Sequence, residues 1–243
     1  RQLHFPCTMS QMMDLPLPER MVYLSGTAIG KQLYVTGGDQ ETGGNHLYTI
    51  DLEKESAQWE KRTAYPGPSR LQSIVLGNGK DRLFLTGGYQ PARSGAESQL
   101  SYDILCYHLT QDKWEVLTSL PSDSGQIPRC LAGGSGVYWN QQLILTGGVN
   151  SRIFKNALDG KAPKDYLKKP VDWYRFNDDV LVYHLDKQTW EIIPQVKGMA
   201  KAGGVLVSYR NSLYMICGET KPGIRCNDII CLPLSDLFNK HSL

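Results

Sequence analysis

Four apolar segments of this chain end in the same way, and this repetition constrains the fold more than any other feature of the sequence. Three of them close on a glycine pair, in QLYVTGGD, RLFLTGGY and QLILTGGV, and the fourth, SLYMICGE, has Cys-Gly at that place. After each of the first three come a polar stretch, a second apolar segment with a tyrosine, a turn and a tryptophan. These aromatic residues are Tyr48, Tyr107, Tyr183, Trp59, Trp114 and Trp190. Such self-similarity is the signature of a repeat architecture.

The repeated segments have the composition of β-strands. They are short, rich in β-branched and aromatic residues, and bounded by turn signals such as Asn78-Gly79. No segment keeps helical periodicity long enough to form a main helix. A glycine pair at a strand end indicates that two backbones approach closely. A Tyr and a Trp at fixed offsets are expected to pack between adjacent four-stranded sheets. We therefore predict an all-β propeller, with blades around a channel.

The repeat resembles the kelch repeat from about Met21 to Leu234. We therefore expect residues 1–243 to form a single kelch-type β-propeller domain. Four blades are few for a closed ring, so the chain forms either a minimal ring or part of a larger one, such as a six-bladed ring. Residues 1–20 are a candidate edge strand that would help to close a ring.

The repeats are unequal, and the third carries the largest surplus. Residues 149–178, VNSRIFKNALDGKAPKDYLKKPVDWYRFND, separate Gly148 from the next strand. This stretch is rich in lysine, contains two prolines and is expected to form one or two short helices. Insertions of this length in a compact domain are usually functional or disordered, so we predict a lid-like segment.

Charge and cysteine pattern exclude several classes of protein. The net charge of +2, without a Lys/Arg run, argues against binding to nucleic acid or to an anionic membrane. No apolar stretch approaches the ~20 residues of a membrane helix, and the first residues lack the apolar core of an intact signal peptide. The six cysteines show no zinc-type spacing, so no metal site is predicted. Cys106, Cys217 and Cys231 lie in apolar runs and are expected to be buried.

The densest group of chemically useful residues follows the fourth strand. Glu219 and Arg225 flank the turn Lys221-Pro222-Gly223, and a Pro-Gly turn can bring the two ends of such a loop together. A carboxylate beside a guanidinium in a cleft can work as a base paired with an anion-binding group. The alternative is a surface salt bridge, which contributes little to stability.

Two further groups are candidate binding residues. Arg70 and Arg129 each follow a turn and precede the first strand of a blade, which is expected to lie beside the channel. Two inward arginines would bind a carboxylate or a phosphate, whereas the alternative is pairing with carbonyls of the loops. Asn150 and Phe154 follow the third glycine pair and suit a polar, partly stacked ligand such as a sugar. The alternative is that the asparagine caps the loop and the phenylalanine anchors the insertion.

Three motifs together resemble those of the bacterial N-acetylneuraminate epimerases, which are kelch-propeller sialic acid mutarotases. These motifs are TGGVNSRIFKNAL, the inserted segment after it, and CGETKPGIR; the KPGxR part is the specific one. The resemblance implies an isomerase in which Glu219 accepts a proton and Arg225 contacts the substrate. It also implies a periplasmic location and a reaction that requires no metal or organic cofactor. Members of the family carry about six blades, of which four are visible here.

The resemblance implies mutarotation by ring opening and closure. One group removes the proton of the anomeric hydroxyl and another donor protonates the ring oxygen, while Arg225 with Arg70 or Arg129 holds the substrate carboxylate. The expected partner is a small sugar acid, and the oligomeric state is left open. The alternative is a kelch interaction module that binds a protein or a glycan without catalysis. A copper radical oxidase is disfavoured, because no spaced set of Tyr, His and Cys ligands is present.

Overall fold

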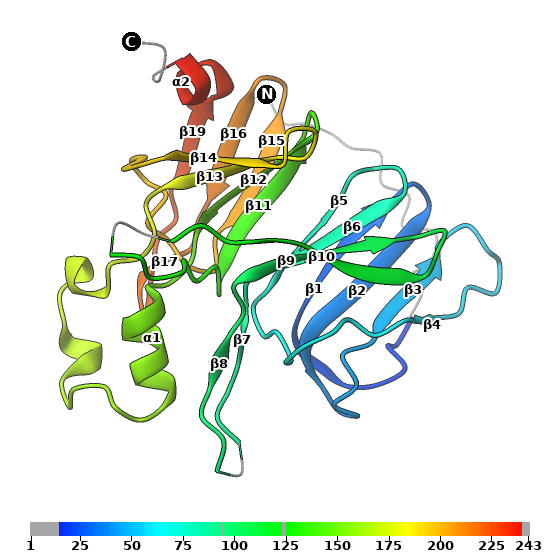
Figure 1. Ribbon diagram of the computed structural model, residues 1–243, viewed down its shortest axis with the longest axis horizontal. Helices are drawn as coiled ribbons and strands as arrows, with labels where there is room; N and C mark the ends of the chain where they lie inside the picture. The colour runs from blue at the N-terminus through cyan, green and yellow to red at the C-terminus, as the bar shows by residue number, and fades with distance from the viewer. Residues whose placement is uncertain (1–14, 94, 123–124, 240–243) are drawn as a thin grey trace, which may run out of the picture.

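The strands of this protein form four blades that follow one another around an arc (Figure 1). The computed structural model describes residues 15–93, 95–122 and 125–239. In each blade the strands are antiparallel, and the first strands of successive blades contact one another in the order β1, β5, β11, β15. The prediction of an all-β, propeller-like arrangement of four repeats is confirmed.

Three blades have four strands and the fourth has three. Blade 1 contains β1 (Met21–Ile29), β2 (Gln32–Gln40), β3 (Leu47–Asp51) and β4 (Glu60–Arg62). Blade 2 contains β5 (Ile74–Gly77), β6 (Arg82–Thr86), β9 (Asp103–His108) and β10 (Lys113–Ser119). Blade 3 contains β11 (Gly134–Trp139), β12 (Gln142–Gly147), β13 (Val180–His184) and β14 (Thr189–Ile193). Blade 4 contains β15 (Val205–Tyr209), β16 (Ser212–Ile216) and β19 (Ile229–Pro233).

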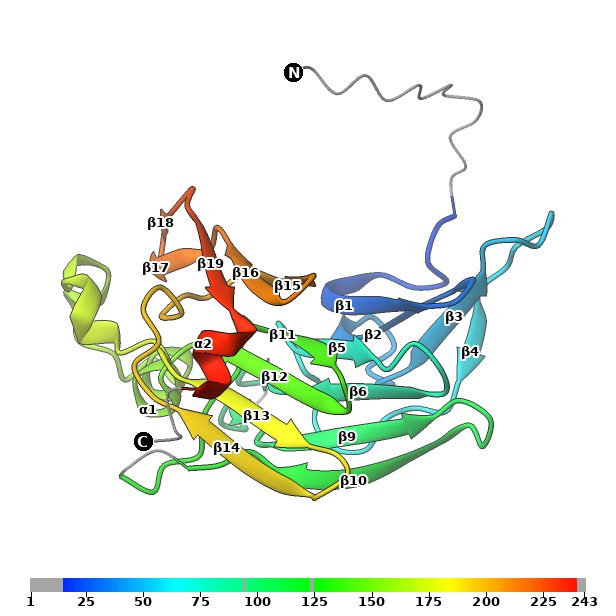
Figure 2. The same cartoon turned by 90° about the horizontal axis from the view of Figure 1, so that it is seen from above.

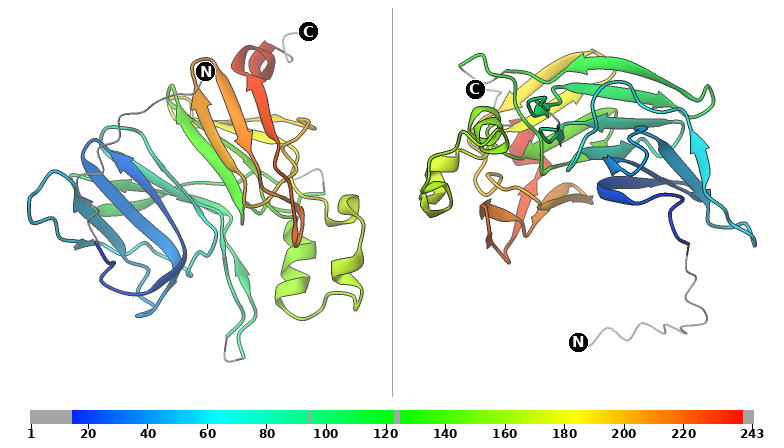
Figure 3. Two further views of the ribbon diagram at one scale, coloured as in Figure 1. Left: turned by 180° about the vertical axis from the view of Figure 1, so that it is seen from behind. Right: turned by 90° about the horizontal axis from the view of Figure 1, so that it is seen from below.

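The remaining elements project from the blades. Two short hairpins are formed by β7 (Tyr89–Gln90) with β8 (Gln99–Leu100), and by β17 (Glu219–Lys221) with β18 (Ile224–Arg225). The insertion holds α1 (Ser151–Leu158), η1 (Tyr166–Lys168) and η2 (Val171–Tyr174), so the prediction of short helices there is confirmed. Helix α2 (Leu234–Asn239) follows the last strand. The views in Figures 1 and 3 show that the insertion and the β7–β8 hairpin extend from the same side of the blades.

The repeated aromatic pairs join neighbouring blades. Tyr107 and Trp114 are cross-strand partners with ring centroids 5.0 Å apart, and Tyr183 and Trp190 are equivalent partners 4.9 Å apart. The indole of Trp114 donates a hydrogen bond of 2.9 Å to the carbonyl of Thr63, which follows the last strand of the preceding blade. The prediction that the Tyr and Trp side chains pack between sheets is therefore confirmed for the pairs of blades 2 and 3.

The glycine pairs lie where two blades meet. In the third pair both residues have a positive φ, +71° at Gly147 and +82° at Gly148. A Cβ at Gly147 would lie 2.5 Å from the carbonyl oxygen of Lys201, and the N–H of Gly148 donates to that same oxygen at 2.8 Å. Only glycine fits both the backbone conformation and the space.

Blade 1 is covered on its outer side by the chain that precedes it. Trp59 donates to the carbonyl of Leu15 at 3.1 Å, and the hydroxyl of Tyr48 donates to Glu19 at 2.6 Å. Residues 15–20 do not form a strand, so the prediction of an edge strand is wrong for them; residues 1–14 lie outside the described residues.

Blade 4 leaves open a face that is buried in blade 3. Figure 2 shows that blades 1 and 4 do not stack face to face. Val207 of β15 is 37% exposed, whereas Val137, its equivalent in β11, is 8% exposed. Cys106 is buried as expected, but Cys217, which lines the pocket described below, and Cys231 of β19 are exposed. In the described part of the chain, the helices are too short and too polar to cross a membrane.

Candidate functional site

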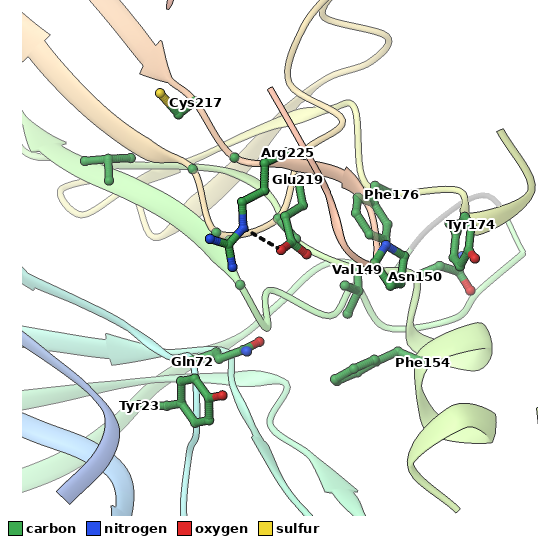
Figure 4. A pocket seen from close by; sticks show the side chains of 18 of the residues that line it. Tyr23, Gln72, Val149, Asn150, Phe154, Tyr174, Phe176, Cys217, Glu219 and Arg225 are labelled. Atoms are coloured by element: carbon green, nitrogen blue, oxygen red, sulfur yellow. Dashed lines mark hydrogen bonds and ion pairs between the residues drawn. The ribbon is translucent and has the colours of Figure 1, made fainter. Parts of the chain in front are cut away.

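A pocket of about 850 Å³ lies where all four blades meet the insertion and the β17–β18 hairpin (Figure 4). The starts of the four first strands form one side, and the insertion and the hairpin form the other. Residues that line it include Tyr23, Gln72, Gly133, Val149, Asn150, Phe154, Tyr174, Phe176, Gly203, Glu219 and Arg225. Pockets of this size, with an apolar wall and a few polar groups, are typical of small-molecule sites.

Glu219 and Arg225 form a pair at the edge of this pocket. They are direct cross-strand partners in the β17–β18 hairpin, and the Arg225 Nε donates to the Glu219 Oε1 at 3.2 Å. Both backbone groups of Glu219 bond to Ala202, at 2.7 and 3.0 Å, which fixes the hairpin to the start of blade 4. The Arg225 side chain is 83% exposed and that of Glu219 is 29% exposed. The turn thus brings the two predicted residues together; their chemical roles stay predictions.

Asn150 and Phe154 also line the pocket, and both have structural tasks as well. The Asn150 carboxamide oxygen accepts from the N–H of Ile153 at 3.1 Å and caps helix α1. The Phe154 ring packs edge-on against Tyr89 of the β7–β8 hairpin, with centroids 5.0 Å apart. The capping and anchoring alternatives are therefore seen in the structure, alongside the position at the pocket that a binding role requires.

The hairpin and the insertion are tied together by Lys221. Its ammonium group donates to the carbonyl of Lys169 at 2.8 Å and to that of Leu167 at 3.4 Å. It also lies 6.0 Å from the ring centroid of Tyr174, a residue that lines the pocket and is 1% exposed. The segment predicted to be a lid is thus joined to the hairpin that carries Glu219.

Arg70 and Arg129 lie elsewhere. Arg70 pairs with Asp103 at 2.8 Å, and its side chain is 2% exposed. Arg129 pairs with Asp179 and donates to the carbonyl of Pro121 at 3.1 Å. Neither arginine lines the pocket. The structure does not bring these two residues to Glu219 and Arg225, because each is held inside its own blade by an acidic partner at the start of the third strand.

Comparison with known proteins decides the family. The family model for N-acetylneuraminate epimerase matches residues 14–237. The chain belongs to the N-acetylneuraminate epimerase family. It is 33% identical over 201 residues to the N-acetylneuraminate epimerase of Salmonella typhi, and this match covers 78% of this chain and 50% of that protein. It is 29% identical over 222 residues to N-acetylneuraminate epimerase 1 of Escherichia coli O6:H1, with 86% and 56% covered.

The solved structure of YjhT shares the fold. It superposes with a TM-score of 0.76 at 24% identity, over 91% of this chain and 65% of that chain. As a member of the N-acetylneuraminate epimerase family, this chain spans about half the length of the curated relatives that it matches.

Several residues of this epimerase-family pocket were missed by the sequence reasoning. Tyr174 and Phe176 of the insertion form an aromatic wall, and the run WYRF at 173–176 was the available signal. Tyr23 and Gln72 lie across the pocket from Arg225 (Figure 4). Neither stands in a motif, so nothing in the sequence marked them.

One group of side chains outside the pocket has the composition of a metal site. Ligand atoms of Cys106, His108 and Glu115, on the outer strands of blade 2, lie within 4.8 Å of one another. The imidazole of His108 bonds to Glu115 at 2.8 Å. In blade 3, His184 meets a glutamate in the same way, at 3.3 Å, where valine replaces the cysteine. The repeated pair indicates a structural link between outer strands.

Proposed function

We propose that this chain carries the catalytic pocket of a sialic acid mutarotase, which interconverts the anomers of N-acetylneuraminate or a closely related sugar acid. The observation that supports this most is the cross-strand pair of Glu219 and Arg225 at the edge of the pocket. A carboxylate and a guanidinium are the two groups needed to accept a proton and to bind a sugar carboxylate. Membership of the epimerase family points to the same chemistry.

The proposed reaction begins when Glu219 takes the proton of the anomeric hydroxyl. The bond between the anomeric carbon and the ring oxygen then breaks, a second donor protonates the ring oxygen, and the open-chain keto acid forms. Rotation about the adjacent carbon–carbon bond followed by the reverse steps gives the other anomer. No atom changes its oxidation state in the overall exchange, so the steps require no redox cofactor.

Arg225 is proposed to hold the substrate carboxylate during these steps. Its contact with Glu219 uses Nε, and among the described residues its two terminal nitrogens have no ion-pair partner. A planar guanidinium with free donors is suited to paired hydrogen bonds with a carboxylate.

The test follows anomer exchange directly. α-N-acetylneuraminate, freshly released by a sialidase, is added to the protein and its conversion is followed by NMR near neutral pH. We expect acceleration by the parent and a loss of about 100-fold or more in Glu219→Gln, since a general base contributes roughly 10²–10⁴-fold. A matched control is Glu53→Gln, because Glu53 is 59% exposed and pairs with Lys31 on blade 1.

Two outcomes would overturn the proposal. The first is a parent protein that does not accelerate exchange. The second is Glu219→Gln with the activity of the parent. Binding of the sugar without acceleration would favour the alternative, a kelch interaction module that binds a glycan without catalysis.

A further inference from the structure

The four blades meet at the pocket through a chain of backbone hydrogen bonds. The N–H of Gln72 donates to the carbonyl of Tyr23 at 3.2 Å, that of Gly133 to Gln72 at 3.0 Å, and that of Gly203 to Gly133 at 2.6 Å. Each residue stands in or just before the first strand of its blade, and all four line the pocket. We call these four residues the inner rim.

All residues of the inner rim share one unusual backbone conformation. Their φ angles are +55° at Tyr23, +55° at Gln72, +68° at Gly133 and +66° at Gly203. Glycine adopts this left-handed region freely, whereas a bulky residue there is an outlier. Blades 3 and 4 thus use the residue that the geometry favours, and blades 1 and 2 do not.

The two side chains of the inner rim project toward the pocket from the side opposite Glu219 and Arg225 (Figure 4). Tyr23 is 60% exposed, so its ring is not held by the core. Within the part of the chain that the structure describes, neither the Tyr23 hydroxyl nor the Gln72 carboxamide has a hydrogen-bond partner. Packing and internal hydrogen bonding therefore do not explain why these two positions depart from glycine.

We propose that Tyr23 and Gln72 recognise the substrate, by hydrogen bonds to hydroxyl or amide groups at the end of the sugar acid remote from its carboxylate. Strained backbone conformations concentrate at ligand sites, where the surrounding structure maintains them. A phenol and a carboxamide offer both donors and acceptors, which suits a polyhydroxylated ligand. The position opposite Arg225 assigns them the uncharged end. This inference rests on the proposed function for the identity of the ligand.

The test replaces each residue with the glycine that blades 3 and 4 use. Tyr23→Gly and Gln72→Gly are expected to keep or raise the melting temperature, because glycine relieves the left-handed conformation. Both are expected to weaken the binding of N-acetylneuraminate, measured by isothermal titration calorimetry, by about 3- to 10-fold, the effect of one lost hydrogen bond. A purely structural residue would lose stability instead.

Two further variants make the result specific. Tyr23→Phe keeps the ring and the backbone strain and is expected to weaken binding through loss of the hydroxyl alone. Gln188 has a φ of +55° in the turn between β13 and β14 and does not line the pocket. Gln188→Gly is therefore expected to change the melting temperature in the same direction as the rim variants, without changing the affinity for the sugar acid.

The inference is overturned if both glycine variants bind with the affinity of the parent, or if affinity falls only together with the melting temperature. This inference is tested separately from the proposed function, because the affinity for the sugar acid tests the inference and the rate of anomer exchange tests the function. A parent that binds the sugar acid through Tyr23 and Gln72 but does not accelerate exchange would overturn the mutarotase proposal alone. A parent that does not bind the sugar acid would overturn both.

Discussion

Three ion pairs recur at the same place in successive blades. In each, a basic residue before the first strand meets an acidic residue at the start of the third strand. The pairs are Arg70–Asp103, Arg129–Asp179 and Lys201–Asp228. In the first and last pairs, the basic side chain is far more buried than its acidic partner. The buried positive charge is therefore compensated by that single carboxylate.

This asymmetry predicts unequal effects of two substitutions. Asp103→Asn leaves the Arg70 guanidinium buried without a counter-charge and is expected to lower the free energy of unfolding by about 3 kcal/mol or more. Arg70→Met leaves Asp103, which is 31% exposed, able to bind water, and is expected to cost about 1–2 kcal/mol. Urea unfolding measures both, and equal losses would contradict the argument. Neither variant is expected to alter sugar binding.

The pair of Lys201 and Asp228 is expected to make the stability of the protein depend on pH. Hydrogen bonds from Lys201 and from Cys226 lower the pKa of Asp228 below its ordinary value of 3.8. A lowered pKa contributes stability that is present above the unfolded value and is lost as pH falls through the folded value. The parent is thus expected to lose stability below about pH 4, and Asp228→Asn to lose part of that acid dependence. Unfolding followed from pH 7 to pH 2.5 measures the difference.

The arginines also show what residue patterns cannot tell. The sequence correctly places Arg70 and Arg129 before the first strand of a blade. Their acidic partners, however, lie 33 and 50 residues further along the chain. Nothing local marks Asp103 or Asp179 as those partners. Tyr23 and Gln72 were missed for a related reason, because the inner rim exists only once four blades are side by side.

At the scale of elements, the β17–β18 hairpin and the insertion act as one unit through Lys221. Local patterns predicted much here: the Pro-Gly turn indicated the hairpin, and the composition of 149–178 indicated short helices. The contact between the two was not predictable, since it joins a side chain to backbone carbonyls of η1 and its flank.

Lys221→Met is expected to loosen the insertion without unfolding the blades. Methionine keeps the apolar stem but loses the charged donors, so amide exchange at residues 166–174 is expected to rise by about tenfold, in line with hydrogen bonds from a charged group. Lys187→Met, in an exposed turn of blade 3, is the control and is expected to leave that exchange unchanged. Unaltered exchange in Lys221→Met would show that the insertion is held by its aromatic contacts alone.

At the scale of the molecule, equivalent positions of two blades are buried or exposed depending on whether another blade packs against them. Val137 faces Ile144 across β11 and β12, and Val207 faces Tyr214 across β15 and β16, in the same register. The glycine pairs and the Tyr–Trp pairs predicted that blades stack. They could not predict which faces remain open, because that depends on the arc as a whole.

These equivalent valines give a matched test. Val137→Lys places a charge between blades 3 and 4 and is expected to cost about 3 kcal/mol or more in the free energy of unfolding. Val207→Lys lies on the open face of blade 4 and is expected to change it by less than about 0.5 kcal/mol. Thermal and urea unfolding measure both. A large loss at Val207 would mean that this face is covered in solution.

The inner rim has a consequence for how the ligand range of such a pocket can change. Gly203 has the left-handed backbone that aspartate and asparagine tolerate, and a Cβ there would meet no atom within 4 Å. Replacing Gly203 by aspartate would therefore add a carboxylate to the pocket without a steric clash. That charge would disfavour sugar acids and favour neutral or amino sugars, so a single substitution at this position is expected to change which sugars the pocket binds.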